Sequence, residues 1–508
     1  MPRAAEGPGQ DPLGKYLTAP VTASVVLAFH VGILFLLSLY GLHRYWILFL
    51  FWRHYKSRPP LTTPPPPSSW PRVTVQLPLF NEWYVVERLL DAVCALDYPR
   101  NRLQIQLLDD STDESRALAC RLAQVRRDEG FDVSHIHRAD RRGFKAGALA
   151  NGLSSATGEF VAIFDADFLP PRDFLKRTLP HFRDAGLGMV QARWGHINTG
   201  YSLLTRLQAL FLDGHFLLEH TARNRSGAFF NFNGTAGLWR RRAIDEAGGW
   251  SDDTLTEDLD ISYRAQMKGW RFLFLPDLVC PAELPVDMGA FRNQQHRWTK
   301  GALQVAKKIL PDLWRGSTSL FVKLESTIHL TSNLGYLLLL VFSLLLFPSL
   351  AARRALGWPV WVNFLEAGAF ALTALSIVVF YSVAQREAFG GPLRLRGGDL
   401  PALMVFGVGM CLNNGRAVLE ALFNIPTEFL RTAKFNIRAK GEGWRDKRYR
   451  TSRRPVGGLE LAAGAYLAAA LGWSVNAGYF WSLPFIGVFL AGYVYVGYLS
   501  LRHALQRA

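Results

Sequence analysis

Hydrophobic residues are concentrated in long runs toward both ends of this 508-residue chain. Apolar residues dominate residues 21–52 and again the stretch beyond residue 326, whereas residues 70–320 have the mixed composition of a globular domain. A helix needs about 20 largely apolar residues to cross a bilayer. The pattern therefore predicts a transmembrane anchor at 21–52 and two transmembrane hairpins, at 326–384 and 456–500.

Between the hydrophobic ends, within residues 72–320, short β-branched runs alternate with helical stretches. Strands are predicted at 73–78, 105–108 and 160–164, and a helix at 82–96. This alternation is typical of an α/β domain whose parallel sheet is covered on both faces. Ligands of such sheets bind at the carboxyl ends of the strands, so polar residues that follow these strands are candidates for a site.

Three further segments flank or connect these parts. Residues 1–20 lack the features of a signal peptide, so they are predicted to be a tail before a retained anchor. Residues 53–71 are predicted to be a proline-rich linker, in which residues 59–71 can form neither a helix nor a central strand. Residues 400–454 combine an apolar stretch with a strongly basic one.

The apolar part of that last segment, residues 400–424, is interpreted as a helix lying at the cytoplasmic membrane interface. If it crossed the membrane, the basic residues 431–454 would lie outside, against the positive-inside rule. Arg416 and Glu420 within it also favour the interface. Five spans then remain, with the amino terminus outside and the carboxyl terminus inside, and a sixth span is the alternative.

The net charge of +16 indicates which kinds of partner the protein can bind. Basic residues beside membrane segments are typical of positive-inside topology and of contact with anionic lipid headgroups. No nucleic-acid motif accompanies them, so nucleic acid is not expected as a partner. The cysteines are scattered without a C-x-x-C pair and are predicted to be reduced and buried, not disulfides or zinc ligands: Cys94, Cys120, Cys280 and Cys411.

Two acidic residues, Asp165 and Asp167, directly follow the strand predicted at 160–164. In an extended strand they would point to the same side, so one can reach a sugar nucleotide while the other binds a cation. Mg²⁺ and Mn²⁺ prefer oxygen ligands, which makes one of these ions the expected cofactor. The alternative is an ordinary acidic turn without a function.

A second acidic turn follows the strand predicted at 105–108. Asp109 and Asp110 in this turn are candidates for contact with the base and ribose of a nucleotide. The alternative is a helix N-cap, a role that Asp113 would fill well, and both roles are compatible.

Lys145 and Gly147 lie between the two acidic turns and supply a cation and a glycine that permits close approach of a ligand. An exposed lysine at a helix start is the alternative for Lys145. Further along, Asp258 is the predicted general base, because an Asp with an ordinary pKa of about 4 is ionised at neutral pH and can accept a hydroxyl proton. A negatively charged first helical turn is the competing interpretation of Asp258.

An aromatic and basic stretch near the end of the domain contains Gln294, Arg297 and Trp298. Arg297 can offset the charge of a diphosphate through paired hydrogen bonds. Trp298 offers a flat apolar face to a pyranose ring, although a tryptophan near a membrane span is often an interfacial anchor.

Taken together, these motifs resemble the processive family-two glycosyltransferases, which include cellulose, hyaluronan and chitin synthases. Within that superfamily the chain is most similar to the plant cellulose-synthase-like A and C groups. The similar stretches include VTVQLPLFNE (73–82), QIQLLDDSTD (104–113), FKAGALANG (144–152), VAIFDADFLP (161–170), TEDLDISYRAQMKGWRF (256–272), ELP (283–285) and QQHRW (294–298). The resemblance implies a GT-A nucleotide-sugar-binding fold and inversion at the anomeric carbon.

The resemblance also implies a role for each matching residue. Asp258 matches the general base and Asp167 the metal ligand. The residues that match nucleotide-sugar-binding positions are Asp109, Asp110, Lys145, Gly147 and Asp165. Those that match acceptor-binding positions are Asn233, Gly234, Thr235, Gln294, Arg297 and Trp298. Phe429, Thr432 and Lys434 resemble the F-x-x-T-x-K gating loop of cellulose synthase, which closes over the active site when nucleotide sugar is present; a lipid-contacting basic loop is the alternative.

The combined expectation is a membrane-embedded enzyme that polymerises a β-1,4-linked glucan from UDP-glucose on the cytoplasmic side and extrudes it between its own helices. Its expected partners are the nucleotide sugar, the growing polysaccharide and the bilayer of a plasma-membrane-type or Golgi-type membrane. The alternatives are a β-mannan synthase that uses GDP-mannose, a transferase that adds one sugar to a lipid, and a catalytically silent scaffold.

Overall fold

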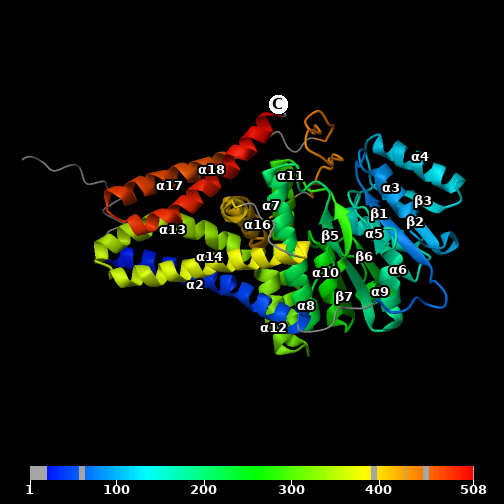
Figure 1. Ribbon diagram of the computed structural model, residues 1–508, viewed down its shortest axis with the longest axis horizontal. Coiled ribbons are helices and arrows are strands. Elements are labelled where there is room, and N and C mark those ends of the chain that lie inside the picture. Colours follow the sequence, from blue (N-terminus) through cyan, green and yellow to red (C-terminus); the bar gives the residue numbers. More distant parts are fainter. Residues whose placement is uncertain (1–19, 57–62, 391–396, 428, 450–456, 507–508) are drawn as a thin grey trace, which may run out of the picture.

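An α/β domain and a bundle of long helices make up the molecule, and they lie at opposite ends of its longest axis (Figure 1). The structure, a computed structural model, describes residues 20–56, 63–390, 397–427, 429–449 and 457–506. Residues 1–19 of the predicted tail, residues 57–62 of the predicted linker and residues 450–454 of the basic segment lie outside these ranges.

A seven-stranded mixed sheet forms the centre of the α/β domain, with the order β3-β2-β1-β4-β6-β5-β7. The strands are β1 (Val73–Leu79), β2 (Leu103–Asp109), β3 (Asp132–His137), β4 (Phe160–Ile163), β5 (Leu187–His196), β6 (Gly237–Arg240) and β7 (Arg271–Ala282). Strand β6 runs antiparallel to both of its neighbours, and the other pairs are parallel. The α/β prediction is confirmed, but a wholly parallel sheet is wrong because the four-residue β6 is too short for a sequence pattern.

Helices cover both faces of this sheet, so its strands are buried on both sides. The helices of this part are α3 (Val86–Cys94), α4 (Ser115–Asp128), α5 (Phe144–Leu153), α6 (Phe174–Thr178), α7 (Leu203–Asp213), α8 (Thr221–Ser226), α9 (Arg241–Glu246), α10 (Glu257–Met267), α11 (Met288–Arg315) and α12 (Leu320–Thr331). Side chains of a strand alternate between faces. In β4, Phe160 and Ala162 enter the core under α3 and α4, whereas Val161 and Ile163 enter the core under α5 and α10.

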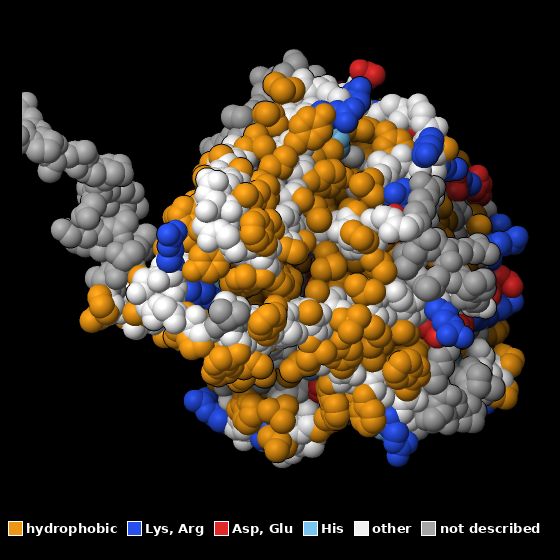
Figure 2. All heavy atoms as spheres, turned by 60° about the vertical axis from the view of Figure 1, so that its left-hand side comes forward, with side chains coloured by type: hydrophobic (Ala, Val, Ile, Leu, Met, Phe, Trp, Pro, Cys, Tyr) orange, Lys and Arg blue, Asp and Glu red, His pale blue; other side chains and the backbone are white. Residues whose placement is uncertain are grey.

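Five helices in the described part of the chain are long and apolar enough to cross a membrane. They are α2 (Pro20–Phe51), α13 (Leu334–Leu356), α14 (Val360–Phe389), α17 (Gly458–Asn476) and α18 (Leu483–Leu505). Large hydrophobic side chains such as Phe29, Phe35 and Phe364 are exposed on these helices, and Figure 2 shows hydrophobic side chains over much of this side of the molecule. Exposing such a surface to water is unfavourable, whereas contact with lipid tails is not. The protein is therefore an integral membrane protein.

Two boundaries of the membrane helices differ from those predicted from the sequence. The hairpin predicted from residue 326 starts at α13, because α12 ends at Thr331 as a separate helix. Residues 400–424 form two helices, α15 (Asp399–Gly409) and α16 (Cys411–Leu422), bent by 41°. Together they would also pass as a sixth span by length and composition, so their interfacial position stays a prediction.

Helix α16 packs on α11 of the α/β domain. The buried carboxylate of Glu420 on α16 lies 2.8 Å from Nε2 of His296 and 3.6 Å from Nζ of Lys300. These contacts connect the membrane helices to the same helix that carries Gln294, Arg297 and Trp298.

Residues 429–449, which we call the strap, have neither helix nor strand and lie against the α/β domain. Phe435 and Trp444 are buried with Val286 in a small core of their own. At the end of the strap, the hydroxyl of Tyr449 donates to Oδ2 of Asp113 at 2.8 Å. The strap therefore returns from the membrane helices to the edge of the sheet.

The four cysteines are free thiols. Cys280 and Cys411 are buried as predicted, whereas Cys120 is exposed and Cys94 only partly buried. Cys120 differs from the prediction because it lies on the outer face of α4, whose inner face is formed by Ala119 and Ala123.

Candidate active site

A cavity of about 170 Å³ opens at the carboxyl ends of β1 and β4. Most of the predicted site residues line it: Asp110, Lys145, Asp165, Asp167, Asn233, Gly234, Asp258, Gln294, Arg297, Trp298, Phe429, Thr432 and Lys434. They come from turns and loops beside the strands, from α5, α10 and α11, and from the strap, so the fold gathers in one place side chains that are far apart in the sequence.

The turn after β4 presents both carboxylates of the D-x-D motif to the cavity. Oδ1 of Asp165 pairs with Nζ of Lys145 at 2.5 Å, and the carboxylate of Asp167 pairs with the ammonium of Lys434. The backbone N–H of Asp165 donates to Oγ1 of Thr235 at 2.9 Å. Thr235 is fully buried and does not line the cavity, so its hydroxyl fixes the turn from behind instead of contacting a ligand.

The Asp165–Asp167 pair fits a divalent cation only when further oxygen ligands come with the substrate. Within the described ranges, no group of three or more His, Cys, Asp or Glu side chains is gathered to hold a metal. Mg²⁺-type cations are commonly held by one or two carboxylates together with phosphate oxygens of the substrate. Each carboxylate pairs with an ammonium group, so a bound cation would share the carboxylates with these lysines or displace them. The donor set therefore fits a cation that binds with a diphosphate.

Asp258 lies in the cavity, in the first turn of α10. Burial and the neighbouring charge of Glu257 raise the pKa of the Asp258 carboxyl to about 7, against the opposing effect of Lys145. The expected ordinary pKa is therefore wrong, because the sequence does not reveal this burial. Oδ1 accepts the backbone N–H of Leu259 at 2.8 Å. A carboxyl whose pKa lies near neutrality is well matched to accept a proton from a hydroxyl.

Lys145 is a central cation of the cavity, and the alternative of an exposed helix-start lysine is wrong. Its Nζ donates to the backbone carbonyl of Gly234 at 2.9 Å and lies 3.8 Å from Oε1 of Glu257. Burial alone would lower the pKa of Lys145, but Asp165 and Glu257 raise it above its ordinary value. The amine therefore stays charged beside the D-x-D turn.

Gly234 is held in a conformation that favours glycine, with φ of +80°. A Cβ atom at this position would lie 3.0 Å from Oδ2 of Asp258 and 3.2 Å from Nζ of Lys145. The absence of a side chain at Gly234 thus leaves room between Asp258 and Lys145. Its neighbour Asn233 donates its backbone N–H to Oε1 of Gln191 at 3.1 Å.

Helix α11 carries Gln294, Arg297 and Trp298, which line the cavity together with the D-x-D turn. The Arg297 guanidinium lies 4.6 Å from the ring centre of Phe429 of the strap. Burial lowers the pKa of Arg297, while Glu257 and other cavity carboxylates oppose this shift. Trp298 lies beside Trp194, with ring centres 6.4 Å apart. The two indole rings form an aromatic wall that suits a sugar ring.

Two predicted nucleotide-binding residues, Asp109 and Gly147, do not line the cavity. Asp109 is buried and accepts from the backbone N–H of Ser111 at 2.9 Å, and its other oxygen lies 2.8 Å from Nε2 of His135. Hydrogen bonds from His135 and Ser111 outweigh burial and lower the pKa of Asp109. Asp109 therefore holds the turn that presents Asp110, and only Asp110 of this pair reaches the cavity.

Gly147 has a packing role that can be tested. A Cβ atom there would lie 2.2 Å from the backbone carbonyl oxygen of Arg142 and 2.7 Å from Nη1 of Arg138. We expect Gly147→Ala to lower the free energy of unfolding by about 1–3 kcal/mol, as overpacked substitutions do. Thermal unfolding of the full chain in detergent measures this. Gly200→Ala is the matched control, because nothing lies within 4 Å of a Cβ at Gly200; equal losses in both variants would contradict the packing role.

The sequence did not single out several charged residues of the cavity. Arg431 of the strap donates from Nη2 to Oε2 of Glu82 at 2.8 Å and from Nε to Oε1 at 3.0 Å. The Arg141 guanidinium lies 3.4 Å from the ring centre of Phe80. Glu82 follows β1 as Asp110 follows β2. Its position at the carboxyl end of a strand could therefore have marked Glu82 as a candidate site residue. Nothing in the sequence pairs Glu82 with a residue of the strap.

Two further cavities extend from the first toward the membrane helices. The second, of about 340 Å³, shares Asp258 and Trp298 with the first. The third, also of about 340 Å³, shares Tyr336 and Tyr381 with the second and reaches Tyr40 of α2. A row of cavities thus runs from the candidate base into the helix bundle.

Comparisons with known proteins agree with this geometry. Residues 71–301 match the family described as "Glycosyltransferase like family 2". The chain is 39% identical over 306 residues to "Glucomannan 4-beta-mannosyltransferase 7" of Arabidopsis thaliana, covering 58% of this chain and 55% of the relative. It is 42% identical over 271 residues to "Glucomannan 4-beta-mannosyltransferase 1" of Oryza sativa subsp. japonica, covering 52% and 51%. The chain thus spans about half the length of the curated relatives it matches.

Among solved structures, the fold is similar to that of the mannosyltransferase PcManGT from Pyrobaculum calidifontis, determined in complex with GDP-Man and Mn²⁺. The TM-score is 0.51 and the sequence identity 24%, over 78% of this chain and 99% of that one. At this identity the likeness establishes the fold alone. The mixed sheet and its D-x-D turn thus define a protein of the GT-A-like class.

Residues 71–301, somewhat less than half of the chain, are thus similar to glycosyltransferase family 2. The expectation of a glucan made from UDP-glucose is wrong, because both curated relatives are described as mannosyltransferases. The error has a physical origin: the resemblance assigns the D-x-D turn, Asp258 and the Q-x-x-R-W motif to the diphosphate and the acceptor, and enzymes that use different donor sugars have both of these in common. The choice of sugar depends on pocket residues that form no motif.

Proposed function

We propose that the protein is a membrane-embedded β-mannan synthase that transfers mannose from GDP-mannose, with inversion, to the 4-hydroxyl of a growing β-linked chain. The observation that carries this proposal is the identity of 39% and 42% to two glucomannan 4-beta-mannosyltransferases. The cavity and its charged residues support the transfer chemistry, and the row of cavities supports a polymeric product.

The proposed roles follow from the geometry of the cavity. Asp258 accepts the proton of the acceptor hydroxyl, and Lys145 and Arg297 stabilise negative charge on the departing diphosphate. Asp110 lies where the nucleotide binds, and Asp165 faces the donor. Asp167, with Asp165, would hold Mg²⁺ or Mn²⁺ together with the diphosphate, and the cation when bound offsets the charge of the leaving group.

The acceptor side of the cavity lies under α11. Trp298 and Trp194 offer apolar ring faces, against which the CH groups of a pyranose can pack. Gln294 and Asn233 line both the first and the second cavity, so their amides can hydrogen-bond successive sugar units. A product that grows away from Asp258 would then enter the second and third cavities and leave between the membrane helices.

The α/β domain is proposed to face the cytoplasm, where nucleotide sugars are made. Arg53 follows the first membrane helix, and the strap is rich in basic residues, among them Arg431, Arg438, Lys440, Arg445 and Arg448. Both placements agree with the positive-inside rule. The organisation into a catalytic domain at 72–320, with membrane segments before and after it, is part of the same proposal.

The raised pKa of Asp258 gives the proposed reaction a defined pH dependence. A base must be unprotonated to act, so kcat/KM is expected to fall about tenfold per pH unit below about 7. Glu257 raises this pKa, and Lys145 lowers it. Rates measured at saturating metal in a series of buffers give the profile. A rate that stays level down to about pH 5, one unit above the ordinary pKa of Asp, would contradict the assignment.

Donor screening on the full-length protein in nanodiscs tests the proposed function. Radiolabelled GDP-mannose, UDP-glucose and UDP-N-acetylglucosamine are supplied in turn with Mg²⁺ or Mn²⁺, and polymer is separated from lipid. We expect ethanol-insoluble label from GDP-mannose that an endo-β-1,4-mannanase releases. Label that extracts into organic solvent would overturn polymer synthesis, and incorporation from another donor alone would overturn the choice of mannose.

A further inference from the structure

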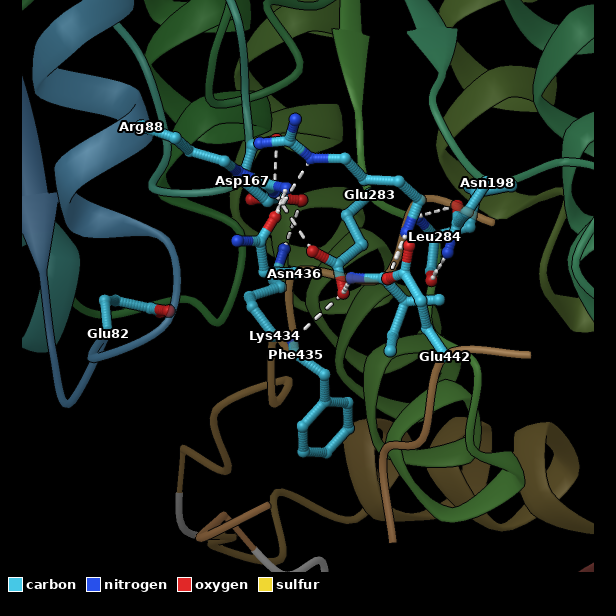
Figure 3. A network of polar contacts seen from close by, with 12 residues as sticks. Glu82, Arg88, Asp167, Asn198, Glu283, Leu284, Lys434, Phe435, Asn436 and Glu442 are labelled. Carbon is cyan, nitrogen blue, oxygen red and sulfur yellow. Dashed lines mark hydrogen bonds and ion pairs between the residues drawn. The ribbon is translucent and has the colours of Figure 1, made fainter. Parts of the chain in front are cut away.

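A buried carboxylate lies directly beneath the part of the strap that carries Lys434 (Figure 3). Glu283 follows β7 and opens the E-L-P motif, which the sequence resemblance left without a role. Its side chain is only 2% exposed. Oε1 accepts the backbone N–H of Phe435 at 2.9 Å and that of Ile437 at 3.2 Å. Glu283 thus binds the backbone immediately after Lys434.

Arg88 of α3 joins this carboxylate to the D-x-D turn. Its Nη2 lies 3.0 Å from Oε2 of Glu283 and donates to the backbone carbonyl of Asp167 at 3.4 Å. Its Nη1 donates to Oδ1 of Asn436 at 2.6 Å. Figure 3 shows these contacts converging between the turn and the strap. One guanidinium therefore touches the strap, the end of β7 and the loop that holds the proposed metal ligand.

The backbone of the strap is shaped for this contact. Asn436 has φ of +54°, in the left-handed region. That conformation turns the N–H groups of Phe435 and Ile437 toward one carboxylate oxygen, as in backbone nests that bind anions. Hydrogen bonds to an ionised group are about twice as strong as neutral ones, so the negative charge of Glu283 is what makes this a firm attachment.

The attachment fixes the residue that faces the donor. Lys434 directly precedes the fixed stretch, and its ammonium pairs with the carboxylate of Asp167. A lysine side chain is flexible and loses rotamer entropy when it is held in one place. Anchoring its backbone beside Asp167 therefore limits where the ammonium can go.

We propose that Glu283 and Arg88 are positioning residues that hold strap residues 434–437 against the D-x-D turn, which keeps the Lys434 ammonium within reach of a bound nucleoside diphosphate. The inference rests on the proposed function only in that the donor carries a diphosphate. It assigns to the E-L-P motif a role that acts through Lys434 and not by contact with substrate.

Binding of GDP in the presence of Mn²⁺ to the full-length protein in detergent, measured by titration calorimetry, tests this inference. Glu283→Gln keeps the shape of the side chain but removes its charge and leaves Arg88 without its ion pair. We expect about tenfold weaker GDP binding, in line with losing charged hydrogen bonds. Should Glu283→Gln fail to fold, Asn436→Gly retains the left-handed backbone and removes one bond to Arg88, with a loss of about threefold expected.

Glu442→Gln is the matched control for charge and contact type. The Glu442 carboxylate also accepts two backbone N–H groups of the strap, from Arg438 at 3.0 Å and Ala439 at 3.2 Å, but it makes no contact with Arg88. This variant is expected to bind GDP within about twofold of the wild type, as surface substitutions usually do.

A double variant separates positioning from general destabilisation. If Glu283 acts through Lys434, Glu283→Gln adds no further loss of GDP affinity to Lys434→Ala. The inference would be overturned if the loss of GDP affinity in the double variant equalled the product of the two single losses. It would also be overturned if Glu283→Gln bound GDP with wild-type affinity. A wild-type protein that binds UDP but not GDP would instead refute the proposed donor, and the same variants measured with UDP would still decide the role of Glu283.

Discussion

Asp258→Asn is expected to abolish sugar transfer, lowering kcat by about a thousandfold, within the range attributed to general bases. The amide cannot accept the proton of the acceptor hydroxyl, while the surrounding charges of the cavity stay in place. GDP binding should persist, because the base acts on the acceptor and not on the nucleotide. Initial rates with saturating GDP-mannose, together with GDP titration on the same sample, measure both quantities.

The loss of activity in Asp258→Asn should not come from a loss of folding stability. The pKa of Asp258 is raised in the folded protein, so its contribution to stability is present below the ordinary Asp pKa and is lost as the pH rises through about 7. Removing the charge is therefore expected to leave the thermal midpoint at pH 8 unchanged or higher. Asp253→Asn, a half-exposed carboxylate nearby that pairs with Lys308, is the matched control and should retain activity. More than about a tenth of wild-type kcat in Asp258→Asn would exclude Asp258 as the base.

Asp167→Asn should produce the second large effect, a fall in kcat/KM of about a hundredfold to a thousandfold, since charge stabilisation by a bound cation contributes several kcal/mol. Its specific signature is in binding: GDP affinity should lose most of its dependence on Mn²⁺. The amide keeps an oxygen but no charge, and the partner ammonium of Lys434 loses its counter-ion. Titrations with GDP at increasing Mn²⁺ measure the change.

Asp173→Asn provides the comparison for that experiment. Asp173 lies a few residues beyond the D-x-D turn, is half-exposed and pairs only loosely with Arg177 at 3.9 Å. Its replacement should leave the Mn²⁺ dependence of GDP binding unaltered. If Asp167→Asn also leaves that dependence intact, the cation is held elsewhere and the role given to the D-x-D turn is refuted.

Much of the fold follows from local sequence. Strands β1 and β2 alternate aliphatic residues with buried Thr and Gln, and β4 is a short apolar run; both patterns give a clear strand signal. Strand β6 has four residues, and its antiparallel direction depends on neighbours distant in sequence. The break between α12 and α13, at Ser332 and Asn333, contains neither proline nor glycine, so composition alone extends the membrane hairpin too far.

Candidate site residues could be predicted from the sequence where an acidic side chain lies at the end of a predicted strand or the start of a predicted helix. Asp110, Asp165 and Asp258 are of this kind. The pairs that join the strap to the domain were not accessible, because Arg431 lies 349 residues from Glu82 in the chain. The burial of Asp258, which raises its pKa, could not be predicted from the sequence either. The sequence therefore predicted residues that the fold brings together around one cavity, but not the contacts that set their charge and position.

The order in which the chain is synthesised has a consequence for where the protein first becomes active. The sheet, α10 and α11 are complete by Arg315, but Phe429, Thr432 and Lys434 follow only after α13 and α14 have been made. Domains generally fold as units during synthesis, so the part of the cavity formed by the sheet, α10 and α11 exists before the strap is made. A nascent or truncated chain would thus expose an open cavity, and catalytic competence would arise only once the helices are inserted in the bilayer. Biogenesis itself would confine the enzyme's activity to the membrane.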